Sequence, residues 1–128
     1  MKNILNTTNA PAAIGPYSQG IETDNLIFLS GQLPIDPSTG AFPEGGIEAQ
    51  TKQSLENVKA ILASAGYTMD NVVKTTVFLY DIADFGKMNA VYESFFSEGN
   101  YPARSAVEVS ELPKSALVEI EVVAIKNK

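Results

Sequence analysis

The run LVEIEVVAI near the C-terminus constrains the fold of this chain more than any other stretch. Side chains alternate between the two faces of a β-strand. One face would carry Val118, Ile120, Val122 and Ala124, and the opposite face Leu117, Glu119, Glu121, Val123 and Ile125. Both faces are substantially apolar, and a small domain can cover only one of them with its own helices. We therefore expect the second face to meet another subunit.

The remaining pattern predicts two helices. Apolar residues recur at helical spacing from Ile47 to Ala65, and Gly66 is a natural C-terminal stop. Asp84 could cap a second helix, with Gly99 beyond its end. The apolar face of this second helix would consist of Phe85, Met88, Tyr92, Phe95 and Phe96.

Strands are expected on both sides of these helices. Pro and Gly in the segment 10–20 indicate a loop that leads into a strand, and the apolar run from Leu26 ends at Ser30-Gly31. Further strands are expected over Val72–Tyr80, Ala103–Val109 and Leu117–Ile125. The order of strands, helix, strand, helix and strands indicates an α+β fold with the helices on one face of the sheet.

Length and composition indicate one globular domain, residues 1–128. Apolar residues make up 45% of the chain and charged residues 19%, which suits a compact core. No run is long enough to cross a bilayer, and the N-terminus lacks the apolar stretch of a signal peptide. We expect a soluble, cytoplasmic protein with no membrane partner.

The residue types that are missing exclude several kinds of chemistry. Without cysteine there is no disulfide, thiolate nucleophile or thiolate metal site. Without histidine there is no serine–histidine triad and no histidine-based ribonuclease. A carboxylate-only Mg²⁺ or Ca²⁺ site is allowed, but no EF-hand or P-loop pattern occurs, so we predict no metal and no cofactor. The net charge of −6 argues against a nucleic-acid partner.

Arg104 is the first candidate for chemistry. It lies in YPARSAVEV, a strand-like run in which a buried guanidinium would be costly without an anion. Pro102 stiffens the approach to the strand, and alternation places the small Ala106 on the same face as Arg104. From the residues alone, an anion site and a surface salt bridge are equally good interpretations of Arg104.

Glu119 is the second candidate. It stands between Val118 and Ile120, in a strand with two apolar faces. A partner for a nearby cation, or a wet strand edge, explains one such glutamate slightly better than an active site does. If Glu119 is partly desolvated, its pKa should rise and suit proton transfer, with Glu121 as the competing residue.

Other candidates are weaker from the residues alone. Tyr17 in GPYSQG could project its phenol from a loop, although a packing role is commoner. Ser30-Gly31 could let a ligand approach the backbone, but turn chemistry is the simpler interpretation. Asn89 lies on the expected second helix, where solvent exposure or a local hydrogen bond would explain it.

The run PARSAVEVSELPKSALVEI closely resembles the signature of the RidA (reactive intermediate deaminase A, or YjgF) family. The residues that match are Pro102, Arg104, Ser105, Val107, Val118, Glu119 and Ile120. Further similar runs are APAAIGPYSQG, SGQLPIDPSTG, QSLENVKAILASAG and VVKTTVFLYDIADFGKMNAVYESFF. The resemblance covers nearly the whole chain.

This resemblance implies a chorismate-mutase-like fold assembled as a homotrimer with sites in clefts between subunits. It implies hydrolysis of 2-imino acids, such as 2-iminopropanoate and 2-iminobutanoate, and of their enamine tautomers to 2-keto acids and ammonia. Arg104 would grip the substrate carboxylate, and Glu119 would position and activate water. Tyr17, from a neighbouring subunit, would line the pocket together with Ser30, Gly31 and Asn89.

One residue departs from the pattern, and two rival functions stay open. Many relatives carry a cysteine where this chain has Ala106, so thiol-dependent contacts or redox regulation are in doubt here. One rival is an endoribonuclease or translation inhibitor, a role given to some relatives. The other is a non-catalytic trimer that binds small carboxylates or acts like a chaperone.

Overall fold

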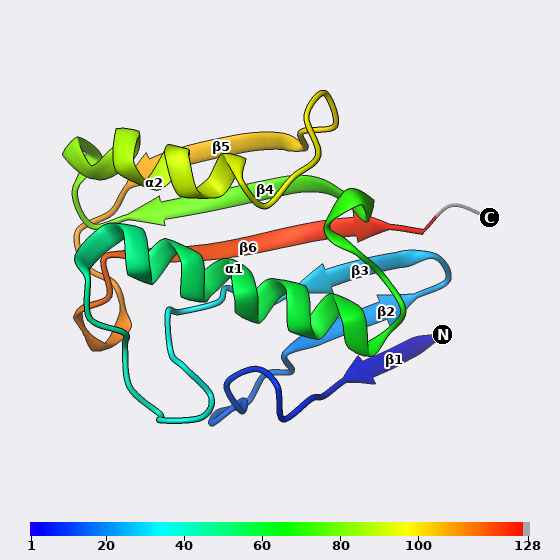
Figure 1. Ribbon diagram of the computed structural model, residues 1–128. Coiled ribbons are helices and arrows are strands. Elements are labelled where there is room, and N and C mark those ends of the chain that lie inside the picture. The colour runs from blue at the N-terminus through cyan, green and yellow to red at the C-terminus, as the bar shows by residue number, and fades with distance from the viewer. Residues whose placement is uncertain (127–128) are drawn as a thin grey trace.

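A computed structural model describes residues 1–126, which form one mixed sheet of six strands and two α-helices (Figure 1). The strands are β1 (Lys2–Leu5), β2 (Gly20–Thr23), β3 (Leu26–Leu29), β4 (Val72–Leu79), β5 (Ala103–Glu108) and β6 (Val118–Ile125). Their spatial order is β1-β2-β3-β6-β4-β5. Only β4 and β5 pair in parallel among these strands, and α2 makes the crossover between them.

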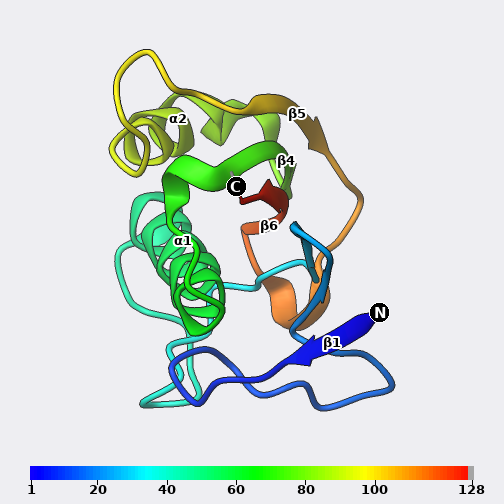
Figure 2. The same ribbon diagram turned by 90° about the vertical axis from the view of Figure 1, so that its right-hand side faces the viewer.

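Both helices, α1 (Gly46–Ser64) and α2 (Phe85–Glu93), cover the same face of the sheet, as the view in Figure 2 shows. The predicted α+β class and one-sided helix layer are therefore confirmed. The main core lies between this layer and the sheet. Its fully buried members include Leu55, Val58, Ile61 and Leu62 of α1, Met88 of α2, and Val118 and Ile120 of β6.

Strand β6 has the two-faced character that its sequence predicts. The side chains of Val118, Ile120, Val122 and Ala124 are buried beneath the helices. Neither α1 nor α2 covers the opposite face of the sheet. This face leaves large apolar side chains open to solvent. Phe28 of β3 and Val107 of β5 keep 46% and 43% of their surface exposed. The open face could therefore bury apolar surface against a partner.

Two local details differ from the predictions. The side chain of Asp84 makes no capping hydrogen bond. Instead, Asp81 accepts a 2.9 Å hydrogen bond from the amide of Ala83 and caps the 3₁₀ turn that precedes α2. Strand β1 was not predicted, because its four residues are too few to show a clear alternation.

Helix α2 is shorter than its apolar pattern. It ends at Glu93, and Phe96 follows in a turn, buried with its ring 4.8 Å from that of Tyr92. Tertiary packing therefore continues the apolar face beyond the last helical residue. None of the helices in the described range is long and apolar enough to span a bilayer.

A candidate active site in two halves

Arg104 is held against helix α2 by two aromatic rings. On β5 it pairs with the buried Thr75 of β4, so its side chain projects to the helix-covered face. The guanidinium carbon lies 4.7 Å from the ring centre of Tyr92 and 5.2 Å from that of Phe85. The guanidinium also donates a 2.6 Å hydrogen bond to Oδ1 of Asn89. Stacking and hydrogen bonding together fix its plane.

The sequence of α2 explains this arrangement. Phe85, Asn89 and Tyr92 are spaced so that they share one helix face. The hydroxyl of Tyr92 lies 2.7 Å from that of Thr75, which anchors the ring. Burial raises the pKa of Tyr92, while the bond to Thr75 and the charge of Arg104 oppose the rise. The phenol is therefore neutral at working pH and offers its π face to the cation.

Arg104 still has hydrogen-bonding capacity. A pocket of about 370 Å³ beside it is lined by Asn89, Tyr92, Glu93, Tyr101, Pro102 and Arg104. A guanidinium has five N–H donors, and within residues 1–126 that of Arg104 makes one hydrogen bond. The free donors suit the two oxygens of a carboxylate.

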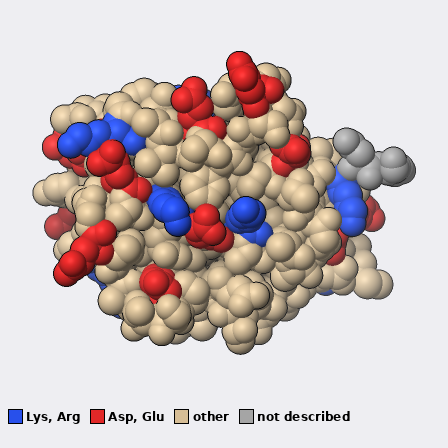
Figure 3. Space-filling view, viewed as in Figure 1, with Lys and Arg blue, Asp and Glu red and all other residues tan. Residues whose placement is uncertain are grey.

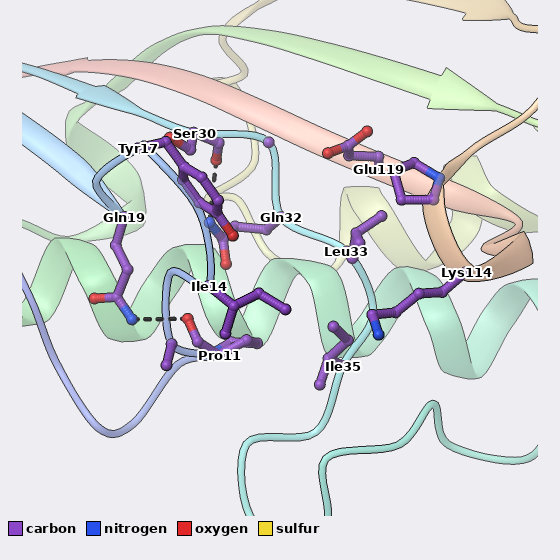
Figure 4. Close-up of a pocket in the computed structure, with 13 residues that line it drawn as sticks. Pro11, Ile14, Tyr17, Gln19, Ser30, Gln32, Leu33, Ile35, Lys114 and Glu119 are labelled. Carbon is purple, nitrogen blue, oxygen red and sulfur yellow. Dashed lines mark hydrogen bonds between the residues drawn. The ribbon is translucent and has the colours of Figure 1, made fainter.

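Glu119 borders a separate cavity of about 420 Å³ (Figure 4). It sits on β6 opposite Phe78 of β4 and projects to the open face of the sheet. The other lining residues are mostly apolar and come from three irregular segments: Pro11, Ala12, Ile14, Tyr17 and Gln19; Ser30, Gly31, Gln32, Leu33 and Ile35; and Pro113 and Lys114. The cavity therefore surrounds one carboxyl group with largely apolar walls.

This environment changes the acidity of Glu119. Burial raises the pKa of its carboxyl, and the neighbouring charge of Glu121 raises it further. Space for the carboxyl depends on Gly31, because a Cβ added there would lie 2.5 Å from Oε2 of Glu119. Glycine is needed at position 31 because any side chain there would collide with the Glu119 carboxyl. The predicted Ser30-Gly31 turn is thus in contact with Glu119, the catalytic candidate.

Tyr17 and Ser30 lie on the wall beside Glu119. Half of the surface of Tyr17 is exposed, and its ring stands next to Ser30 in Figure 4. The hydroxyl of Ser30 donates a 2.6 Å hydrogen bond to the carbonyl of Ser18. Its oxygen can therefore still accept a hydrogen bond from a ligand.

Sequence reasoning missed Lys114, which also borders this cavity. Its φ of 57° is left-handed, a conformation that non-glycine residues rarely adopt, and Ser115 follows with a φ of 59°. The run LPKSA gives no signal for this conformation, because lysine and serine have no preference for it.

The six predicted site residues thus fall into two groups. Tyr17, Ser30, Gly31 and Glu119 share one cavity. Asn89 and Arg104 share the other. The two groups use opposite faces of the sheet, so one subunit does not bring them together. Among the described residues, no three acidic side chains converge closely enough to hold a metal ion.

Comparison with known proteins identifies the family of this chain. The family model described as endoribonuclease L-PSP matches residues 7–126. A RutC family protein of Pyrococcus horikoshii is 56% identical over 127 residues, which cover 99% of this chain and 100% of that protein. The chain belongs to the RidA/YjgF (L-PSP) family. The resemblance drawn from the sequence motifs is confirmed.

Other members of the RidA/YjgF family show similarity over the same extent. A Salmonella typhimurium protein named 2-iminobutanoate/2-iminopropanoate deaminase is 52% identical, covering 99% of this chain and 100% of its own. The crystal structure of Escherichia coli TdcF with bound serine matches with a TM-score of 0.93 at 45% identity, over 98% of this chain and 99% of that one. The crystal structure of the YjgF gene product from E. coli matches with a TM-score of 0.93 at 51% identity, again over 98% of this chain and 99% of that one. The expected RidA-type fold is confirmed.

Proposed function

We propose that this protein hydrolyses 2-imino acids and their enamine tautomers to 2-keto acids and ammonia. The observation that carries the proposal is a complementary pair of groups: a stacked arginine with free donors, and a glutamate whose pKa is raised in an apolar cavity. The similarity to a protein named 2-iminobutanoate/2-iminopropanoate deaminase extends over 99% of this chain and supports the same proposal. Small 2-imino acids such as 2-iminopropanoate and 2-iminobutanoate are the proposed substrates.

We propose further that the two half-sites meet in a homotrimer. In one subunit Arg104 and Glu119 project from opposite faces of the sheet. The exposed apolar side chains of the open face, Phe28 and Val107 among them, support burial of that face against a neighbour. One subunit would then supply Arg104 and Asn89, and its neighbour Glu119. Because Tyr17 shares the cavity of Glu119, it would come from the same neighbour.

Binding would begin at the substrate carboxylate. The guanidinium of Arg104 donates two hydrogen bonds to its oxygens, in the plane set by Phe85, Tyr92 and Asn89. This contact directs the imine carbon toward the Glu119 cavity of the adjacent subunit. The side chain of the substrate would then lie along the apolar cavity wall near Ile14. Positioning of this kind accounts for part of the rate.

The chemistry needs one proton-transfer group. A protonated imine is already an electrophile and needs no further activation. The oxygen of a water molecule bonds to C2 of the substrate, and the Glu119 carboxylate takes a proton from that water. The resulting carbinolamine receives that proton on nitrogen, and the C–N bond breaks to release ammonia. Loss of the hydroxyl proton leaves the keto acid. The raised pKa of Glu119 brings its proton exchange closer to neutral pH, where general acid–base catalysis is most effective.

A coupled assay tests this function. A pyridoxal-phosphate threonine dehydratase, which releases 2-iminobutanoate, would be run under conditions where imine hydrolysis limits 2-ketobutyrate formation. The purified protein should accelerate that step in proportion to its concentration. No acceleration over heat-denatured protein would refute the proposed activity. Binding of carboxylates without acceleration would support the non-catalytic trimer instead.

An RNA-directed function has less support. Figure 3 shows acidic groups scattered among the basic ones on the helix-covered face, and the chain carries a net charge of −6. Nucleic-acid binding relies on clustered positive charge. Ribonuclease activity that persists through purification and disappears in an Arg104 variant would be needed to revive it.

A further inference from the structure

Gln19, Gln50 and Asn57 are carboxamides buried beside the Glu119 cavity. Their exposed fractions are 2%, 9% and 1%. Each makes hydrogen bonds to the backbone of a different irregular segment that borders the cavity. Such segments have few sheet partners, so their backbone groups must be satisfied by side chains.

Gln19 fixes the N-terminal wall. Its Oε1 accepts a 2.7 Å hydrogen bond from the amide of Thr7. Its Nε2 donates to the carbonyls of Thr7 and Pro11 at 3.0 and 2.8 Å. Figure 4 shows the amide turned toward Pro11. These bonds set the start of the loop that carries Ile14 and Tyr17.

Asn57 fixes the second wall from the middle of α1. Its Nδ2 donates to the carbonyls of Leu33 and Ile35 at 3.1 and 2.9 Å. Its Oδ1 accepts a 2.9 Å hydrogen bond from Gln53, so the oxygen and both N–H groups of the amide have partners. Pro34 lies between the two acceptors and has no N–H to offer a neighbouring strand. The amide of Asn57 instead satisfies the backbone carbonyls on both sides of Pro34.

Gln50 fixes the third wall, two turns earlier on α1. Its Oε1 accepts a 2.8 Å hydrogen bond from the amide of Leu117. Leu117 joins the left-handed turn at Lys114 and Ser115 to β6, two residues before Glu119. The bond therefore sets where the chain leaves the turn and enters the strand that carries Glu119.

We propose that Gln19, Gln50 and Asn57 are positioning residues of the active site, each holding one wall of the Glu119 cavity. The catalytic consequence rests on the proposed function, but the structural effect does not. None of the three needs to touch substrate. By fixing the walls they exclude water from around the Glu119 carboxyl and keep the cavity in one shape.

The test is a carboxyl-carbon NMR titration of Glu119 in the assembled protein. Wild type would be compared with Asn57→Ala and with Gln19→Met, which keeps the side-chain volume and loses the amide. The matched control is Val58→Ala, a fully buried neighbour of Asn57 on α1 whose truncation destabilises the core without touching a wall. Glu121 of β6, whose charge acts on Glu119, and Lys114, which lines the same cavity, are unchanged in every variant.

We expect both wall variants to lower the pKa of Glu119 toward the ordinary glutamate value, because water enters the cavity. Val58→Ala should leave the pKa of Glu119 unchanged. The wall variants should also lose about tenfold in kcat/KM per folded molecule, which the control retains. An unchanged Glu119 titration in both wall variants, or an equal shift in Val58→Ala, would overturn the proposal. Wild-type protein without deaminase activity would refute the proposed function and leave the titration result standing.

Discussion

Arg104 and Glu119 project from opposite faces of the same sheet. Arg104 lies in register with the buried Thr75 of β4, while Glu119 lies opposite Phe78, three residues further along that strand. Neighbouring residues on a strand alternate in direction, so Thr75 and Phe78 face opposite ways. The proposed reaction uses both groups, and for this reason we place its site between two subunits.

Removal of the Arg104 guanidinium should abolish binding of the substrate carboxylate. Arg104→Ala is expected to lower kcat/KM by about 100-fold or more, because two charge-assisted hydrogen bonds are lost. Arg104→Lys should recover only part of the loss, since an ammonium cannot bond bidentately. The coupled dehydratase assay measures both, with the exposed Lys87→Ala of α2 as control. Equal activity of Arg104→Ala and wild type would contradict the assignment.

Glu119→Gln should separate chemistry from binding. Without a proton-transfer group, turnover should fall by about 100-fold or more, while affinity for the unreactive product 2-ketobutyrate changes little. Glu121→Gln is the matched variant on the same strand face. It should keep its activity and move the acid limb of the pH–rate profile to lower pH, because the charge of Glu121 helps to raise the pKa of Glu119. Unchanged turnover in Glu119→Gln would point to Glu121 or to solvent as the base.

The same carboxyl group should make stability depend on pH. Burial raises the pKa of Glu119 in the folded state, whereas the unfolded chain keeps the ordinary value. Between these two values the folded state binds more protons, so the free energy of unfolding falls as pH rises through that window. Glu119→Gln removes this loss. Its melting temperature relative to wild type should rise as the pH increases above the ordinary glutamate pKa, and should level off above the raised pKa of Glu119. A constant difference would show that Glu119 is not desolvated.

Gly31 should be required for activity and much less for folding. A methyl group at this position would meet the Glu119 carboxyl at 2.5 Å and displace it from the cavity. Gly31→Ala is therefore expected to reduce kcat by about tenfold or more. In the Glu119→Gln background it should have little further effect, since the two changes act on one group.

The control for Gly31 is Gly86→Ala on α2, where an added methyl group has open space. This variant should keep full activity and gain up to about 0.5 kcal/mol in the free energy of unfolding. Urea denaturation measures the stability of both variants. Full additivity of Gly31→Ala with Glu119→Gln would contradict the proposed contact.

Local pattern predicted most of the fold. Helical spacing from Ile47 predicted α1 within a residue or two, and the alternation in β6 predicted the two sets of residues that occupy its opposite faces. The short strand β1 was missed because it depends on its pairing with β2. The capping role of Asp81 was missed although its hydrogen bond to Ala83 is local, because Asp84 offered the same kind of cap. The family motifs selected Arg104 and Glu119 but carried no information on their faces.

The placement of site residues depends on contacts that a linear pattern does not encode. The side of the sheet that Arg104 takes relative to Glu119 follows from the register of β5, β4 and β6. The bond from Leu117 to Gln50 joins residues 67 positions apart, and that from Asn57 to Leu33 joins residues 24 apart. No local propensity indicates such partners.

Mixing two inactive variants tests the shared site most directly. Arg104→Ala and Glu119→Gln subunits would be co-refolded in equal amounts, with native mass spectrometry to verify mixed trimers. In the proposed trimer each site takes Arg104 from one subunit and Glu119 from the next, so about a quarter of the sites should be intact and restore about a quarter of wild-type deaminase activity. Mixed trimers with no more activity than either variant alone would contradict a site built from two subunits.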